Sequence, residues 1–91
     1  MADFMLVRHK VQDYDVWKPF YDADLPRRNE AGLSEVYLLR DAEEPNDIFI
    51  LFAAQDIAVA KDFAESDSLR EVMERAGVVS KAEVYLLRSA E

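Results

Sequence analysis

Apolar side chains recur along this chain with two different spacings, and the alternation between them divides the chain into six elements. Four segments are short, rich in β-branched and aromatic residues and bounded by polar turns, which is typical of β-strands. They cover residues 4–11, 33–40, 48–54 and 81–88. Between them, apolar residues recur every three to four positions, which predicts helical segments within residues 13–32 and 56–77. The expected order is therefore strand, helix, strand, strand, helix, strand.

Both predicted helical segments contain an interruption. Pro19 and Pro26 fall within the first, and each removes an amide donor, so we expect a kink or two short helices there. The apolar spacing of this segment is carried by Trp17, Phe20, Tyr21, Leu25 and Arg28. In the second segment, Ser68 and Glu71 have the spacing of a capping box, which predicts a separate helix over residues 69–76.

The order of elements predicts an α+β fold of the ferredoxin-like type, βαββαβ, with a four-stranded antiparallel sheet in a single domain over residues 1–91. Right-handed crossovers place residues 4–11 and 48–54 in the centre of the sheet. The hexapeptide Glu-Val-Tyr-Leu-Leu-Arg occurs twice, at residues 35–40 and 83–88, and both copies fall on edge strands. The repeat indicates two half-domains related by pseudo-symmetry.

The strands are apolar on both faces, although helices can cover only one face of such a sheet. Residues 48–52, Ile-Phe-Ile-Leu-Phe, supply apolar side chains to both faces, and the repeated hexapeptide does the same. A second face left in water would expose more apolar surface than monomers tolerate. We therefore expect a homodimer that forms through the sheet face and the edge strands, with the repeated Tyr37 and Tyr85 as contacts and Arg40 and Arg88 pairing with carboxylates at its rim.

Charge and composition narrow the range of partners. The formal net charge is −8 and the pI is near 4.5, so neither nucleic acid nor an anionic membrane is an expected partner. The chain has no cysteine, no run of apolar residues long enough to cross a bilayer and no basic region at its start, so we expect a cytoplasmic protein. It also lacks a phosphate loop, a dinucleotide fingerprint and a histidine-rich metal pattern, so we expect no cofactor and no metal.

Several stretches resemble the dimeric α/β-barrel superfamily, and within it the small proteins related to antibiotic-biosynthesis monooxygenases. The resemblance is carried by residues 7–11 running into 13–18, by residues 67–73 and by residues 76–78. It implies that two ferredoxin-like chains pack their sheets face to face. Members of the superfamily include cofactor-free oxygenases, lactone isomerases, haem-degrading enzymes and ligand-sensing domains, so the fold does not determine the function. The resemblance implies that the haem-degrading members use an asparagine, a tryptophan and a histidine together. Haem degradation is not expected here, because the only asparagines, Asn29 and Asn46, lie near a helix end and in a turn.

Four residues are candidates for a site. His9 lies at the end of a central strand and could accept a proton from a phenol or enol near pH 7. Trp17, Tyr14 and Tyr21 could line a pocket for a planar ligand between helix and sheet. Each also has a structural interpretation, which we favour: a buried histidine bonded to a carbonyl or an acidic neighbour, a tryptophan in the core, and tyrosines with their hydroxyls in water.

Two functions are compatible with this pattern. The first, which we favour, is a small homodimeric protein that binds a small apolar or aromatic molecule in a cavity between sheet and helices, or whose interior is simply packed. The second is a cofactor-free monooxygenase or isomerase that acts on an aromatic polyketide-like or enolisable substrate, with His9 as base. An enzyme needs a pocket with convergent polar groups, so the surroundings of His9 distinguish the two.

Overall fold

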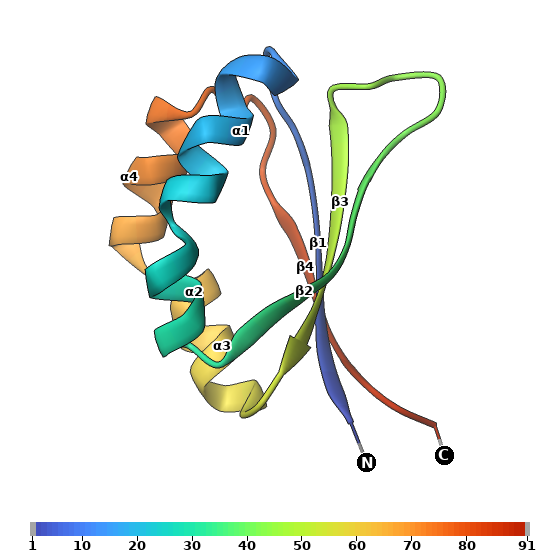
Figure 1. Cartoon of the computed structure of the whole chain (residues 1–91), viewed down its shortest axis with the longest axis vertical. Coiled ribbons are helices and arrows are strands. Elements are labelled where there is room, and N and C mark those ends of the chain that lie inside the picture. Colours follow the sequence, from blue (N-terminus) through green and yellow to red (C-terminus); the bar gives the residue numbers. More distant parts are fainter. Residues whose placement is uncertain (1, 91) are drawn as a thin grey trace.

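The computed structural model describes residues 2–90, which form one sheet and four helices. The strands are β1 (Asp3–Lys10), β2 (Leu33–Arg40), β3 (Asp47–Ala54) and β4 (Glu83–Arg88). The helices are α1 (Tyr14–Ala23), α2 (Leu25–Glu30), α3 (Ile57–Ala64) and α4 (Asp67–Arg75). All four helices lie on one side of the strongly twisted sheet (Figure 1).

The sheet has the strand order β2-β3-β1-β4, and each neighbouring pair is antiparallel. This confirms the ferredoxin-like α+β prediction, with β1 and β3 in the centre and the two copies of the hexapeptide on the edges. Strand β1 is shifted by one residue from the predicted range, and Val11 makes only an isolated bridge to Val78. In no described part of the chain is a helix long and apolar enough to cross a membrane.

The two prolines divide the first helical segment as predicted. Helix α1 begins after Asp13, whose side chain accepts a hydrogen bond from the amide of Asp15, and it contains Pro19. Pro26 lies in the first turn of α2, where its missing amide hydrogen costs little. Gly32 follows with φ of +74°, a conformation that glycine adopts without strain, and it turns the chain into β2.

The predicted capping residue of α4 is wrong. Ser66, rather than Ser68, has the extended backbone of an N-cap, and its hydroxyl accepts a hydrogen bond from the amide of Leu69 at 3.3 Å. Ser68 lies inside the first turn, and its hydroxyl accepts a bond from Arg27 at 2.6 Å. Of the two serines in this segment, the earlier one, Ser66, is therefore the N-cap of α4.

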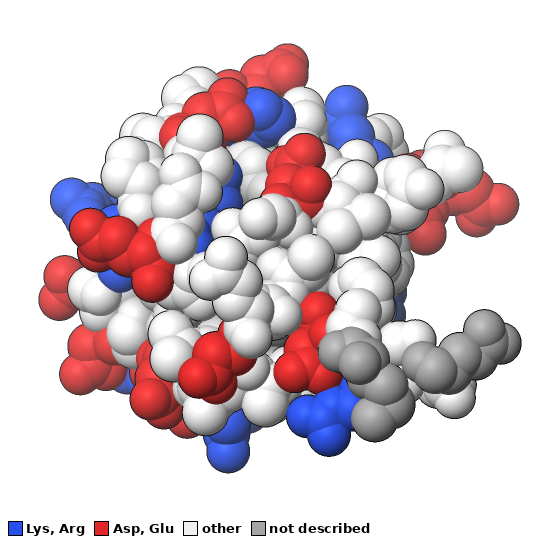
Figure 2. Space-filling model, turned by 60° about the horizontal axis from the view of Figure 1, so that its bottom comes forward, with Lys and Arg blue, Asp and Glu red and all other residues white. Residues whose placement is uncertain are grey.

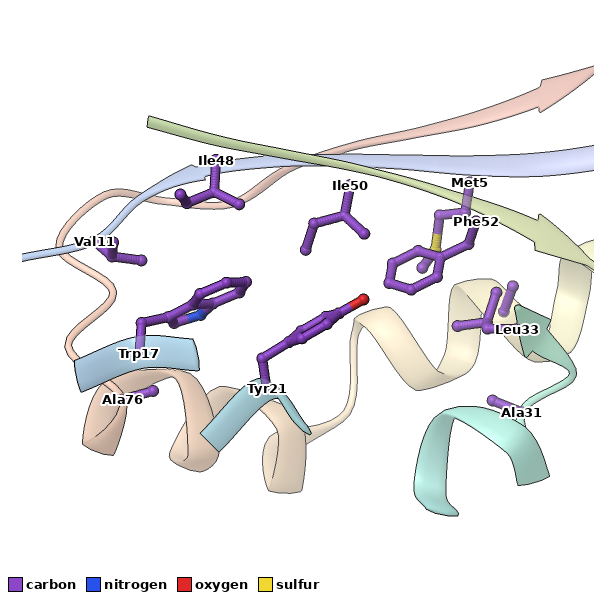
Figure 3. Packing of buried hydrophobic residues seen from close by; sticks show 11 residues of the cluster. Met5, Val11, Trp17, Tyr21, Ala31, Leu33, Ile48, Ile50, Phe52 and Ala76 are labelled. Atoms are coloured by element: carbon purple, nitrogen blue, oxygen red, sulfur yellow. The ribbon is translucent and has the colours of Figure 1, made fainter. Parts of the chain in front are cut away.

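The core lies between the helices and the side of the sheet that faces them. Its members are mostly apolar side chains from β1, β3, α1 and the ends of the loops (Figure 3): Met5, Val11, Trp17, Tyr21, Ala31, Leu33, Ile48, Ile50, Phe52, Ala60 and Ala76. Ile50 belongs to this core, and the adjacent Phe49 points to the opposite face.

The other face of the sheet carries no helix and is apolar, as predicted (Figure 1). Tyr37, Leu39, Tyr85 and Leu87 are 59%, 52%, 46% and 42% exposed. Phe49 lies between the two edges, with the guanidinium of Arg8 5.1 Å from its ring centre. The expected rim pairing of Arg88 with a second subunit is not needed to satisfy its charge, because Arg88 pairs with Asp3 of its own chain at 2.8 Å.

Candidate functional site

A cavity of about 80 Å³ lies between the sheet and the helices, and its wall is almost entirely apolar. Residues of β1, β3 and all four helices line it, and the polar ones are His9, Tyr21, Asp24 and Arg28. Figure 3 shows the rings of Trp17 and Tyr21 on α1 lying opposite side chains of the sheet. Six of its lining residues also belong to the core: Met5, Trp17, Tyr21, Ile50, Phe52 and Ala76.

The sheet is widened beside His9. The amide of Lys10 donates a hydrogen bond to the hydroxyl of Ser80, and the strand register places Arg8 opposite Glu83. The one residue between Arg8 and Lys10, His9, therefore faces two residues, Lys81 and Ala82. These two residues were predicted to extend β4, but they bulge out of it, and Ala82 lines the cavity. The bulge leaves His9 without a partner strand on one side.

His9 is 4% exposed, and neither of its ring nitrogens has a hydrogen-bond partner. Its ring meets the ring of Trp17 edge-on, with centroids 5.5 Å apart. The nearby carboxylate of Asp47 is already held by two bonds from Arg8, of 3.2 and 2.8 Å. The structural interpretation of His9 as a ring bonded to a carbonyl or an acidic neighbour is therefore wrong.

Burial lowers the pKa of His9 to about 4, because the charged imidazolium is poorly solvated there, although the negative charge of Asp47 acts in the opposite direction. The ring is thus neutral at pH 7, with one nitrogen that donates and one that accepts. An unpaired donor and an unpaired acceptor in the interior together cost several kcal/mol. A bound molecule could supply both partners.

The three aromatic candidates form one row with His9. Trp17 stacks on Tyr21 with ring centroids 4.9 Å apart, and Tyr14 lies 5.7 Å away on the other side of Trp17. Tyr21 donates its hydroxyl to Glu35 at 2.8 Å, so the expectation that this hydroxyl points into water is wrong. Burial and this bond raise the pKa of Tyr21. Tyr14 does not line the cavity; the guanidinium of Arg40 covers its ring at 3.9 Å.

The structure adds a residue that sequence reasoning did not assign to the site. Arg28 is 6% exposed and lines the cavity, with its guanidinium 3.8 Å from the centre of the Tyr21 ring. The available signal was its spacing, because Arg28 falls on the apolar stripe of Trp17 and Tyr21. A charged residue on a buried stripe either extends its charged group to the solvent along an apolar surface or keeps that group inside the protein to bind another group.

A surface groove of about 410 Å³ adjoins the cavity, between α4 and residues 78–82. Ala64, Met73 and Ala82 border both spaces, so these side chains separate them. The groove is shallow and its polar side chains, such as Lys81, are exposed.

The acidic turn before β3 is explained by its own hydrogen bonds. The carboxylate of Asp41 accepts the amides of Glu43 and Glu44 at 2.9 and 3.0 Å, which lowers the pKa of Asp41. Within residues 2–90, no group of three or more acidic or histidine side chains is placed to hold a metal ion.

No family model matches this sequence, and no curated protein matches it either. Solved structures do match it. A candidate antibiotic biosynthesis monooxygenase from Bordetella bronchiseptica superposes with a TM-score of 0.76 at 15% identity, over 100% of both chains. A variant of SnoaB, a cofactor-independent oxygenase from Streptomyces nogalater, gives 0.71 at 13% identity, over 99% of this chain and 94% of the other. A conserved protein from Methanosarcina mazei gives 0.70 at 14% identity, over 97% and 92%.

The chain has the fold of the antibiotic biosynthesis monooxygenases. This confirms the fold that the resemblance of residues 7–11, 13–18, 67–73 and 76–78 implied. Identities of 13–15% establish the architecture alone, since one fold supports many chemistries. What the cavity does must be argued from its own residues.

Proposed function

We propose that this protein binds a small, mostly apolar molecule that carries a hydrogen-bonding group, and that this group reaches His9. The observation that carries the proposal is the pair of buried, unpaired ring nitrogens at the edge of an apolar cavity. Native interiors rarely leave such atoms unsatisfied, and those that remain call for an explanation. A ligand with a hydroxyl or carbonyl group supplies it.

The cavity sets the size of the ligand. At about 10–15 Å³ for each water-sized volume, 80 Å³ holds roughly five to eight non-hydrogen atoms. A single aromatic ring with one substituent has this size, and the flat rings of Trp17 and Tyr21 offer it a surface.

Phenol and toluene form a matched pair of probes, because they have the same shape and only phenol forms hydrogen bonds. Trp17 is the only tryptophan, so its fluorescence reports binding directly. We expect phenol to bind about tenfold more tightly than toluene, and His9→Leu to abolish that difference. Equal affinity of the two probes for the unaltered protein would remove His9 from the proposal.

A cofactor-free isomerase or monooxygenase is the second candidate, favoured by the unprotonated state of His9 beside Trp17. An isomerase would move a proton from an enolisable carbon to His9 and return it to another atom of the same substrate. A monooxygenase would in addition take up dioxygen, with one oxygen atom entering the substrate and the other leaving as water at the expense of substrate electrons. A pKa near 4 makes His9 a weak base, which places this candidate second.

Turnover distinguishes the two candidates. Enzyme activity would appear as proton exchange at carbon or oxygen consumption without added flavin or metal, and His9→Ala would lower kcat by about 10² or more. Saturable binding without either reaction supports the binding protein.

The uncovered face of the sheet supports a further part of the proposal, a homodimer that packs sheet on sheet. Tyr37, Leu39, Tyr85 and Leu87 expose apolar surface around Phe49 over both edges, which is what an isologous contact requires. A cytoplasmic location stays a prediction from the sequence.

A further inference from the structure

We propose that the ligand is a short carboxylic acid, whose carboxylate pairs with Arg28 while its other polar group reaches His9. This rests on the proposed function, since it concerns the same cavity. It adds the chemical class of the ligand and a residue that recognises it.

The contacts of Arg28 leave its charge without a counterion. Its side chain is buried, and one guanidinium nitrogen, Nη1, donates to the carbonyl oxygen of Tyr21 at 2.5 Å. The guanidinium also lies 3.8 Å from the centre of the Tyr21 ring. Among residues 2–90, no carboxylate forms an ion pair with it. A guanidinium has five N–H donors and is always charged, and the carbonyl of Tyr21 takes one of them.

The neighbouring carboxylates are engaged elsewhere. Asp24 precedes Arg28 by one helical turn and also lines the cavity, yet it pairs with Arg27 at 3.3 Å. Glu35 accepts the hydroxyl of Tyr21. Arg27 has this ion pair, a bond to Ser68 and the ring of Phe63 as partners, although it is less buried than Arg28. The more deeply placed cation is therefore the one that lacks an anion.

Capping of α1 explains only part of this arrangement. Tyr21 lies in the last turn of α1, where a cation interacts favourably with the free carbonyls. One neutral carbonyl occupies one donor, however, and a buried cation is normally paired with an anion. A carboxylate can take two parallel N–H donors of a guanidinium and balances the charge of Arg28.

The ligand class follows from the two ends of the site. Arg28 and His9 line the same cavity, with the stacked rings of Tyr21 and Trp17 along the wall between them. The space holds a body of a few carbon atoms. The geometry thus fits a short apolar acid with a hydroxyl or carbonyl group at its far end.

Isovalerate and isovaleramide test the carboxylate, because they share one shape and differ in charge. Titration at constant ionic strength, followed by Trp17 fluorescence and by melting temperature, should show isovalerate binding about tenfold more tightly or more. Arg28→Met keeps the aliphatic stem and should abolish this preference. Arg75→Met removes an exposed charge of α4 that lines neither the cavity nor the groove, so it serves as the control, with the preference retained.

Equal affinity for the acid and the amide would overturn the inference. If phenol binds while isovalerate does not, the proposed function stands and the carboxylate assignment fails; if neither binds, the proposed function fails. Should Arg28→Met not fold, the unaltered protein still decides the question. The ¹⁵N signal of the Arg28 Nε–H should shift on addition of isovalerate and stay in place with isovaleramide, and an unmoved signal at saturation would contradict the pairing.

Discussion

His9 shows how one residue can be unfavourable for the fold and useful in a site. An apolar side chain of similar shape would leave no unpaired atoms in the interior, and such replacements are often neutral or stabilising. The chain instead places a histidine at the end of a central strand, next to a bulge that removes its neighbours. A polar residue kept in a place that stability alone does not favour is a candidate for function.

The lowered pKa of His9 predicts acid sensitivity. Because the ring is harder to protonate in the folded state, the unfolded state binds more protons between pH 6.5 and about 4. The free energy of unfolding should therefore keep its full value above about pH 6.5. It should decrease by an amount on the order of 3 kcal/mol as the pH falls from 6.5 to about 4. Urea unfolding followed by circular dichroism across the window measures it.

The control for this pH dependence is His9→Leu. Acidic side chains also titrate below pH 5, so the prediction concerns the difference between the two proteins. The variant should unfold at the same or a higher urea concentration at pH 7 and lack the histidine contribution at lower pH. Identical pH profiles would show that His9 is not buried as described.

Among the elements, α4 carries a clear test of local structure. Ser66→Ala removes the hydroxyl that accepts the amide of Leu69 and should cost about 1 kcal/mol of stability. Ser68→Ala is the matched control, because Ser68 lies inside the helix and bonds only exposed side chains, and it should cost less than about 0.5 kcal/mol. Thermal unfolding of both variants decides between them, and a larger loss at Ser68 would restore the sequence-based assignment.

The elements were predictable where one strong local signal determined them. The order of the elements and right-handed crossovers predicted the strand order, and Pro19 and Pro26 predicted the division into α1 and α2. The capping serine of α4 was missed because Ser68, with Glu71 three residues later, has the spacing of a capping box, whereas Ser66 is followed at that spacing by Leu69. The start of β4 was misplaced because the bulge at Lys81 and Ala82 depends on bonds from Lys10.

The site was predictable only in part, for a physical reason. The sequence identified His9, Trp17 and Tyr21 by type and spacing, and the structure brings them into contact. Whether His9 finds a partner depends on the strand register, which no local pattern specifies. Whether Arg28 has a counterion depends on whether Asp24 forms its ion pair with Arg27 or with Arg28. Both pairs have a helical spacing, of three and four residues, so the sequence does not distinguish them.

At the scale of the whole molecule, cavity and open sheet face lie on opposite sides of the sheet. The chain has 19 acidic and 11 basic residues, and both kinds are scattered over the face that Figure 2 shows. The open face is instead apolar, and it provides the contact surface of the proposed dimer. Association and ligand binding should therefore be separable by mutation.

Phe49 and Ile50 provide that separation, because neighbouring residues of β3 face opposite sides. Phe49→Asp should convert a dimer of about twice the 10.5 kDa chain mass into a folded monomer, as measured by sedimentation equilibrium. Ile50 is 3% exposed in the core, so Ile50→Asp should unfold the protein. A monomeric unaltered protein, or a dimer that survives Phe49→Asp, would contradict the sheet-on-sheet contact.

The central claim is that the unpaired nitrogens of His9 receive partners from a ligand in the cavity. Since His9 is the only histidine, its two ring ¹⁵N signals can be observed in the intact protein without assignment. Near pH 7 we expect the free protein to show a neutral imidazole, and saturation with phenol to shift the non-protonated nitrogen in the direction of hydrogen-bond acceptance. Unchanged ¹⁵N signals, while Trp17 fluorescence shows that phenol is bound, would contradict the account.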